Sequence, residues 1–322
     1  MTKSLRIERL RPEHAAQIVQ CFHRVYGDSY ANVLFYKSEV LAEAIADAAV
    51  CCVGALNDEN QVLGHMAMTF GTAGGTPELG NTVVDPTARG AGVAWQVGAQ
   101  LAAWCGELGY SGFLHYPTSN HHIMQRQSVK KGFETGLMLG YIPAETDGKV
   151  QTTDQRLRQA ATIVYEPLDE PLADPQASTA YLPADWADLI RQLARDCRLP
   201  RKWRDGMSDM PSAISQAELV DYPERKLARL TVLAVGEDLD GRLQDFAMSG
   251  QPCLQVDFLM NDTAIAAGVA LAASRDFRFC GWLPGYRRSD VIRLQKVDPA
   301  LTDMNPQLVN PTAQALLKRI LD

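Results

Sequence analysis

The chain has 322 residues, of which 46% are hydrophobic and 21% are charged, as in an ordinary globular protein. This length favours two domains over one. The formal net charge of -7 argues against wholesale nucleic-acid binding, which needs clustered positive charge, and is compatible with a cationic or amine substrate.

The cysteines and the apolar runs indicate in which cellular compartment the protein is expected. The seven cysteines are an odd number and lie far apart except for Cys51 and Cys52, so we expect reduced, mostly buried thiols in a cytoplasmic protein. The first residues lack the apolar core of a signal peptide. The longest near-apolar run, residues 264–273, is too short to cross a bilayer, so we expect no membrane partner.

The first part of the chain predicts a weak strand over residues 5–10, two helices and a hairpin. Pro12 and an acidic neighbour are typical of a helix start, and Ser38 is placed to cap the second helix. Residues 50–56 and 62–70, with a polar four-residue loop between them, predict a β-hairpin.

Three tyrosines, Tyr26, Tyr30 and Tyr36, lie in and around the loop between the two predicted helices. Aromatic side chains with hydroxyl groups can form the wall of a substrate pocket, which makes these residues candidates for substrate binding. Packing of the same tyrosines between the helices is an equally good interpretation.

A predicted strand over residues 78–84 leads through Asp85-Pro86 into a glycine turn and then a helix. Apolar residues at 93, 97, 101, 104 and 108 place one stripe on that helix. The first N–H groups of a helix have no partner within the helix, and glycines let a ligand approach them closely. The turn therefore predicts an anion site suited to a pyrophosphate, to which Arg89 adds a positive charge.

Two common phosphate motifs are excluded here, because no Gly-Lys-Ser/Thr follows and the third glycine of the dinucleotide fingerprint is missing. However, Arg89-Gly90-Ala91-Gly92-Val93-Ala94 resembles the acyl-CoA signature Arg/Gln-x-x-Gly-x-Gly/Ala of the GNAT superfamily of N-acetyltransferases. Residues 130–134, Lys-Lys-Gly-Phe-Glu, resemble the helix end and Gly-Phe of that family. The resemblance covers residues 4–168.

The resemblance implies acetyl-CoA, or another acyl-CoA, as co-substrate. The residues that it implies for CoA binding are Val83, Val84, Arg89, Gly90, Ala91, Gly92, Val93, Ala94 and Asn120. It also implies that the predicted strand 110–116 splays away from its neighbour and opens a slot for the thioester.

Catalytic candidates follow from the same resemblance. Many family members use a glutamate in this part of the sheet as general base, and here that residue is Glu78, although a solvated strand-end carboxylate is the competing interpretation. The usual general-acid tyrosine is replaced by Ser128, a much poorer acid. Tyr116, His121 and His122 are alternatives, and a thiolate with a thiol pKa of about 8.5 can leave without help.

All six histidines lie between residues 14 and 122, which invites a metal interpretation. However, His121 and His122 are adjacent, point apart on a helix and have no ligand partner four residues away. We predict no metal site, and we expect capping contacts for these two residues.

Elements then follow in a regular order. Residues 119–120 are placed to cap a helix that runs to 131, strands are predicted over 135–142 and 160–167, and a polar loop over 144–158. Residues 169–175 are typical of a linker. Beyond it we predict a helix from 183, a strand over 229–235 and a helix over 239–248. Arg201, Lys202, Trp203 and Arg204 are expected to form a solvated basic patch.

The second half repeats the first in order and length of elements. Strand 253–260, helix 262–275 and strands 277–283 and 291–297 match the series from residue 110 to 167. We predict an α/β protein of the α+β type with tandem GNAT-like folds, each a mixed, mostly antiparallel sheet flanked by helices, in domains 1–168 and 169–322. The glycine turn does not recur, because Glu237 and Asp238 place negative charge there. The second domain is therefore expected to lack CoA and to complete the acceptor pocket, dimerise or serve as a cover.

The sequence predicts an acyl-CoA-dependent N-acyltransferase that transfers acetyl to a small-molecule amine, with no nucleic-acid partner. A non-catalytic acyl-CoA sensor or interaction module is the alternative, because of Ser128 and the degenerate second half. An amine on a carrier protein or a secondary metabolite is a third acceptor class, which the acidic chain mildly disfavours for an acidic carrier. A homodimer is left open.

Overall fold

The computed structural model describes residues 5–30, 32–71, 74–144, 157–168 and 179–321. Its strands in the first half are β1 (Arg6–Arg9), β2 (Val50–Leu56), β3 (Val62–Thr69), β4 (Glu78–Val84), β5 (Gly112–His115), β6 (Phe133–Ile142) and β7 (Gln159–Pro167). Those in the second half are β8 (Thr179–Leu182), β9 (Lys202–Asp205), β10 (Gln216–Tyr222), β11 (Leu227–Ala234), β12 (Cys253–Leu259), β13 (Arg278–Leu283) and β14 (Val291–Val297).

The helices are α1 (Ala15–Tyr26), α2 (Ser38–Ala46), α3 (Val93–Glu107), α4 (His122–Ser128), α5 (Ala187–Asp196), α6 (Leu239–Ala247), α7 (Ile265–Ala273) and α8 (Pro311–Leu321). Short 3-10 turns are η1 (Pro12–His14), η2 (Val33–Tyr36), η3 (Pro86–Ala88), η5 (Ala184–Trp186) and η6 (Pro223–Arg225). No helix in these described ranges is both long enough and apolar enough to cross a membrane.

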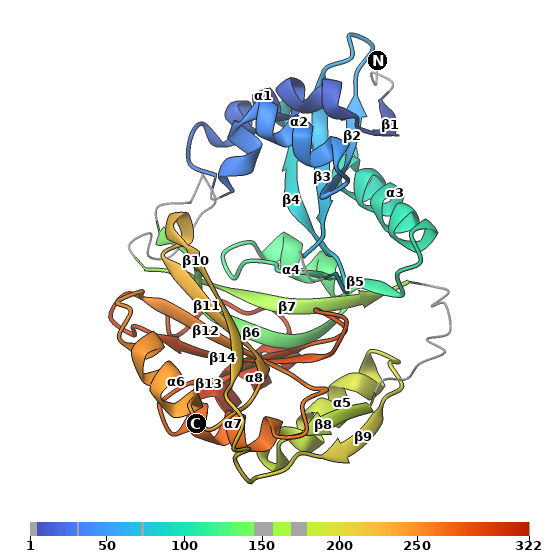
Figure 1. The fold of residues 1–322 in the computed structure, drawn as a ribbon. Helices are drawn as coiled ribbons and strands as arrows, with labels where there is room; N and C mark the ends of the chain where they lie inside the picture. The colour runs from blue at the N-terminus through green and yellow to red at the C-terminus, as the bar shows by residue number, and fades with distance from the viewer. Residues whose placement is uncertain (1–4, 31, 72–73, 145–156, 169–178, 322) are drawn as a thin grey trace.

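One twelve-stranded sheet runs through both halves in the order β1-β2-β3-β4-β5-β7-β6-β13-β14-β12-β11-β10, and β8 pairs with β9 in a small separate sheet. Most pairs are antiparallel, while β4 with β5, β11 with β12 and, in the small sheet, β8 with β9 are parallel. The predicted class, a mixed and mostly antiparallel sheet flanked by helices, is confirmed. Figure 1 shows the first half above and the second half below, with β6 and β7 between them.

The strand order repeats within the sheet. In the first half β4 lies beside β5, then β7, then β6, and in the second half β11 lies beside β12, then β14, then β13. The parallel pair of each half is connected through a helix, α3 in the first and α6 in the second. This repetition supports the predicted tandem arrangement. The division at 168 and 169 stays a prediction, and the whole of the predicted linker 169–175 and most of loop 144–158 lie outside the described residues.

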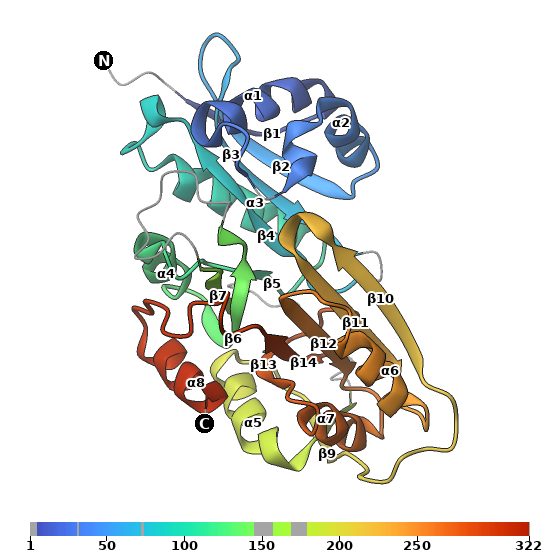
Figure 2. The ribbon, with the colours of Figure 1, turned by 90° about the vertical axis from the view of Figure 1, so that its left-hand side faces the viewer.

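Helices cover both faces of the first part of the sheet (Figures 1 and 2). On one face α1 and α2 bury Phe22, Phe35 and Leu41. On the other face α3 buries Val97 and Leu101. The apolar periodicity of these helices therefore has its expected structural role, since each helix buries one stripe against the sheet.

The sequence predictions need several corrections at element ends. Ser38 is the first residue of α2 and not its cap, and α4 begins at His122 instead of 120. The buried stripe of α3 ends at Cys105, since Leu108 is 48% exposed. All seven cysteines are free and buried, as predicted.

Four elements were missing from the sequence predictions: β8, β9, β10 and α8. The predicted basic patch is also wrong at Arg201, whose guanidinium is buried and donates to both carboxylate oxygens of Asp290 at 2.9 and 3.1 Å. Charge-assisted pairing with an acid distant in sequence outweighs the cost of burying this arginine.

The two halves meet where Gly136 of β6 lies opposite Gly281 of β13. A Cβ atom at Gly136 would lie 2.5 Å from the carbonyl oxygen of Cys280 and 2.5 Å from the Cα of Gly281. Both contacts are with backbone, which cannot rotate away. The close approach of two strands at this point therefore requires glycine.

We predict that Gly136→Ala destabilises the protein by roughly 1–3 kcal/mol, because the added methyl group overpacks the junction of the halves. Urea unfolding measures the change in the free energy of unfolding. Gly241→Ala in α6 is the control, since no heavy atom lies within 4 Å of the added Cβ. That change should stabilise the helix by roughly 0.5–1 kcal/mol. Equal effects of the two substitutions would contradict the tight junction.

Candidate functional site

A slot opens between β4 and β5 because these parallel strands share a single register pair, Glu78 opposite Leu114. The amide of Leu114 donates to the carbonyl of Pro77 at 2.8 Å, and beyond this point the strands diverge. Between them lies a cavity of about 1460 Å³ that residues of both halves line. The splaying that the family resemblance implied is therefore present in the structure.

A β-bulge shapes the wall of this cavity on β4. Two residues, Asn81 and Thr82, lie opposite the single residue Met66 of β3, and Asn81 has a φ of 52°. The Tyr30 hydroxyl donates to Oδ1 of Asn81 at 3.2 Å, and the ring Nδ1 of His65 lies 3.0 Å from its carbonyl oxygen. A bulge leaves an extra residue outside the ladder, so backbone groups here are available to a ligand.

The glycine turn after β4 is organised by the buried carboxylate of Asp85. One oxygen accepts from the amide of Thr87 at 3.0 Å and from its hydroxyl at 2.7 Å. The other accepts from Nε of Arg24 at 2.6 Å. Burial acts to raise the pKa of Asp85, but the hydrogen bonds from Thr87 and Arg24 outweigh it and hold the pKa below its usual value. The Asp85 carboxylate therefore stays ionised and holds the turn in place through these hydrogen bonds.

The glycines place the chain at the start of α3. Gly90 has a φ of 83°, and Gly92, which precedes the first helical residue, has a φ of 70°. In the described part of the chain, no acceptor is bonded by the N–H groups of residues 90–94. Open donors at a helix N-terminus form an anion site. The exposed Arg89 lies beside them with no carboxylate of the described residues within 4 Å.

Most of the predicted CoA-binding residues line the cavity: Val84, Arg89, Gly90, Gly92, Val93, Ala94 and Asn120. Ala91 does not line it, and the side chain of Val83 is buried in the core beneath α1. The side chain of Val83 therefore cannot contact a ligand there. Binding of CoA by these residues stays a prediction.

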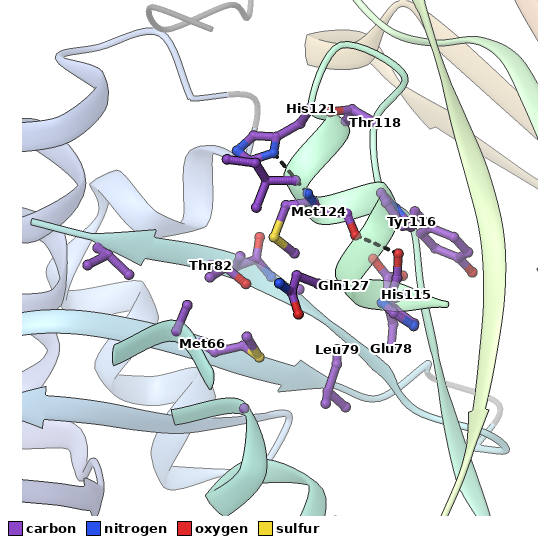
Figure 3. A pocket seen from close by; sticks show the side chains of 18 of the residues that line it. Met66, Glu78, Leu79, Thr82, His115, Tyr116, Thr118, His121, Met124 and Gln127 are labelled. Carbon is purple, nitrogen blue, oxygen red and sulfur yellow. Dashed lines mark hydrogen bonds between the residues drawn. The ribbon is translucent and has the colours of Figure 1, made fainter. Parts of the chain in front are cut away.

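Glu78 lies at the point where β4 and β5 diverge, and Figure 3 shows it grouped with His115 and Tyr116 at one end of the cavity. Burial raises the pKa of the Glu78 carboxyl, while the charges of Arg225, Arg229 and Arg293 act to lower it. A partly buried carboxyl of this kind is suited to general-base work near neutral pH. Glu78 is the first residue of β4 and is partly exposed, so its role as general base stays a prediction.

Beside Glu78 lie two side chains of β5 and the residue that follows it. The His115 ring is buried, which lowers its pKa to about 4 and keeps the imidazole neutral at pH 7. The Tyr116 hydroxyl is buried with no hydrogen-bond partner among the described residues. Burial first, and then the charge of Glu78, hold the pKa of Tyr116 well above its ordinary value. This phenol therefore keeps its proton at neutral pH and can donate a hydrogen bond.

Ser128 also lines the cavity, but its hydroxyl is already engaged. Its Oγ lies 2.7 Å from the carbonyl oxygen of Met124 and 3.0 Å from that of Gln125. A serine has one hydroxyl proton, and here the preceding helical turn accepts it. His121 caps α4 by accepting from the amide of Met124 at 3.1 Å, which agrees with the predicted capping role.

The three predicted substrate tyrosines divide into two groups. Tyr26 and Tyr30 line the cavity, and their rings also pack on Phe22. Tyr36 does not line it, because its hydroxyl accepts from the backbone amide of Tyr30 at 2.8 Å. Tyr36 therefore supports the loop through the backbone of Tyr30, and its contact with substrate stays a prediction.

Arg225, which the sequence analysis did not single out, reaches this cavity from the second half. It ends the η6 turn between β10 and β11, its guanidinium donates to the Tyr141 hydroxyl, and Arg158 donates to its carbonyl at 2.8 Å. Nothing in the local sequence marks it, because only the long-range pairing of strands brings β11 toward β4.

The corresponding turn of the second half is filled by its own chain. A Cβ atom at Gly236 would lie 2.1 Å from the carbonyl oxygen of Ala213, and the amide of Ser215 donates to the Asp238 carboxylate at 2.7 Å. That hydrogen bond, aided by Arg242, lowers the pKa of Asp238 to about 2. The expectation that no phosphate binds here is consistent with this arrangement.

Within the described residues, no cluster of three or more His, Cys, Asp or Glu side chains could hold a metal ion. The absence of a metal from the reaction stays a prediction. The slot is lined by the carboxyl group of Glu78, the phenol of Tyr116 and the helix N-terminus of α3 with its open amides. This set can bind an anion and move a proton.

Comparison with known proteins gives a family match. A sequence model of the acetyltransferase (GNAT) family matches residues 15–125. The chain is also similar to a solved GNAT acetyltransferase from Brucella melitensis in complex with acetyl-CoA, with 27% identity, 35% of this chain and 75% of that chain covered, and a TM-score of 0.30.

Two further solved structures are similar. A phosphinothricin acetyltransferase from Sinorhizobium meliloti in complex with acetyl-CoA has 15% identity, 52% of this chain and 91% of that chain covered, and a TM-score of 0.41. The ribosomal-protein-S18-alanine N-acetyltransferase from Escherichia coli has 14% identity, with coverage of 53% and 98% and a TM-score of 0.41. No curated protein matches the chain. Residues 15–125 are thus similar to the acetyltransferase (GNAT) family.

Proposed function

We propose that the protein is an acyl-CoA-dependent N-acyltransferase that transfers an acetyl group from acetyl-CoA to the amine of a small molecule. The observation that supports this most is the slot between β4 and β5, which connects the open amides at the start of α3 with Glu78. A slot with an anion site near one end and a proton acceptor near the other fits a long phosphorylated thioester.

In this proposal the N–H groups of residues 90–94 bind the pyrophosphate of CoA, and Arg89 adds a full positive charge. The pantetheine arm lies between the splayed strands, where it replaces the missing strand pairing. A backbone N–H of β4 at the bulge near Asn81 stabilises the oxyanion. The thioester carbonyl then lies close to Glu78 and Tyr116.

The acceptor must lose a proton before its nitrogen can attack. Glu78 accepts that proton, directly or through a water molecule, and the neutral nitrogen forms a bond to the thioester carbon. The nitrogen of the tetrahedral intermediate loses its second proton to solvent, the C–S bond breaks, and the CoA thiolate takes a proton from Tyr116 or from solvent. The products are the amide and CoA. Holding the amine and the thioester together in the cavity supplies much of the rate enhancement.

The alternative is a non-catalytic acyl-CoA sensor. It is favoured by one observation, that the position of the usual general-acid tyrosine is Ser128, whose proton is already bonded within α4. The sensor and the enzyme both bind acyl-CoA, and they differ in turnover. The tests below therefore measure binding and turnover separately.

The first prediction concerns the anion site. Calorimetric titration of acetyl-CoA into the wild type should give micromolar binding, about -8 kcal/mol. Gly92→Val should abolish it, because the side chain disturbs a left-handed position beside the open amides. Gly250→Val is the matched control, since Gly250 also has a positive φ, of 77°, and open space around its Cβ, but does not line the cavity. An equal loss of acetyl-CoA binding in both variants would contradict the assignment of the anion site to this turn.

The second prediction concerns the base. Glu78→Gln should lower kcat by roughly 10²- to 10⁴-fold, the usual contribution of a general base. In the wild type, activity falls as the pH drops through the pKa of Glu78, because the protonated carboxyl cannot accept a proton. Since burial raises that pKa, the midpoint should lie above the ordinary value of about 4.3.

Steady-state rates with a nitro-substituted aromatic amine, which is too weak a base to be protonated over this pH range, isolate the titration of Glu78 from that of the acceptor. Glu107→Gln is the control, since Glu107 is an exposed partner of Arg9. The assignment fails if Glu78→Gln keeps the same acid limb. If acetyl-CoA binds but no amine is acylated by the wild type, the sensor is the better description.

The third prediction separates the two candidate acids. Tyr116→Phe should lower kcat by up to roughly 100-fold, the lower end for general acids, because a thiolate also leaves unaided. Ser128→Ala should leave kcat much closer to the wild type, since its proton is bonded to helix carbonyls. Both rates are measured with saturating acetyl-CoA. A larger loss in Ser128→Ala would reverse the assignment.

A further inference from the structure

We infer that the acceptor amine also carries a carboxylate, as an amino acid does, and that Arg225 of the second half binds this carboxylate. The inference rests on the proposed function, because it names the acceptor class for the same cavity. Its starting point is that a chain segment far from residues 15–125 places a guanidinium inside the slot.

Arg225 is held in a defined position. It lies at the tip of the hairpin of β10 and β11, which extends toward the first half in both views (Figures 1 and 2). Its guanidinium lies 5.4 Å from the centre of the Tyr141 ring and donates to the hydroxyl of that ring. Arg158 fixes the backbone by donating to the Arg225 carbonyl at 2.8 Å. A fixed guanidinium of this kind presents its remaining donors in one direction.

The charges around Arg225 do not balance within the described residues. Arg293 donates to both oxygens of Asp257 at 2.7 Å, and Arg229 lies 3.9 Å from the same carboxylate. No carboxylate of the described residues lies within 4 Å of Arg225, and Glu78 acts on it only at longer range. Among the described residues, the Arg225 guanidinium thus has no anionic partner within 4 Å. A partly buried cation in this situation favours an anion from the ligand.

At this end of the cavity, the negative Glu78 and the positive Arg225 fit a molecule that carries one positive and one negative charge. Glu78 is suited to accept a proton from an ammonium group, and Arg225 is suited to a carboxylate, which matches its two parallel N–H donors. The two side chains are close enough for the charge of Arg225 to act on Glu78. An amine without a carboxylate would leave Arg225 unpaired next to the reacting groups, which costs binding free energy.

The test compares matched acceptors with saturating acetyl-CoA, measured as release of the CoA thiol. The acceptors are amino acids, their amides and their decarboxylated amines. For at least one amino acid we expect kcat/KM to exceed that of its amide by about 10-fold or more. Arg225→Gln should reduce this ratio to near one, mainly through a higher KM for the amino acid. Arg225→Lys keeps the charge and should keep part of the preference.

Arg242→Gln is the control for loss of a surface guanidinium, since Arg242 pairs with Asp238 outside the cavity. Equal use of acids and amides by the wild type, or an equal loss for all acceptors in Arg225→Gln, would overturn the inference and leave the acyltransfer intact. If no amine is acylated, the proposed function fails, and calorimetry of amino acids and amides with the CoA-bound protein decides the inference. Carboxylate-dependent binding that Arg225→Gln removes sustains it, and its absence overturns it.

Discussion

The structure depends on one interrupted pairing, the parallel contact of β4 with β5 that is limited to Glu78 and Leu114. Beyond this pair the two strands leave backbone donors and acceptors without sheet partners, which is costly unless water or a ligand meets them. The bulge at Asn81 and the open amides before α3 add further backbone groups without hydrogen-bond partners to the same slot. A ligand with a polar, extended arm is the natural complement of such a slot, and the proposed site follows from this geometry.

The second half contributes part of the wall of the slot. The sheet continues through the glycine contact of Gly136 with Gly281, and this contact fixes the position of β11 and its hairpin relative to β4. The rigidity of a continuous sheet matters here, because a guanidinium is useful for recognition only if it is held in place. The loop before β4 adds a further tie, since the Thr76 amide donates to the Gly285 carbonyl at 2.8 Å. The two halves thus contribute complementary parts to one cavity.

The local features of this site could be predicted from the sequence, and the long-range ones could not. The apolar periods and the Asp-Pro-to-glycine turn predicted β4, α3 and the anion site, because short-range backbone geometry decides them. Arg225 and the burial of Arg201 against Asp290 depend on strand pairing between distant segments. Tyr36 shows the same limit, since a loop tyrosine can face substrate or support the loop, and only the fold decides.

The repeated strand order gives this division a physical rationale. Two copies of one topology start with the same helix N-terminus after the parallel strand, yet only the first keeps its amides open. In the second, the chain around Ala213 and Ser215 occupies the turn, and Asp238 accepts the hydrogen bond that an anion would accept. Because this turn is filled from within, it offers no open helix N-terminus to an anion in the described part of the second half. The second half instead contributes to the cavity through the hairpin of β10 and β11, which places Arg225 in its lining.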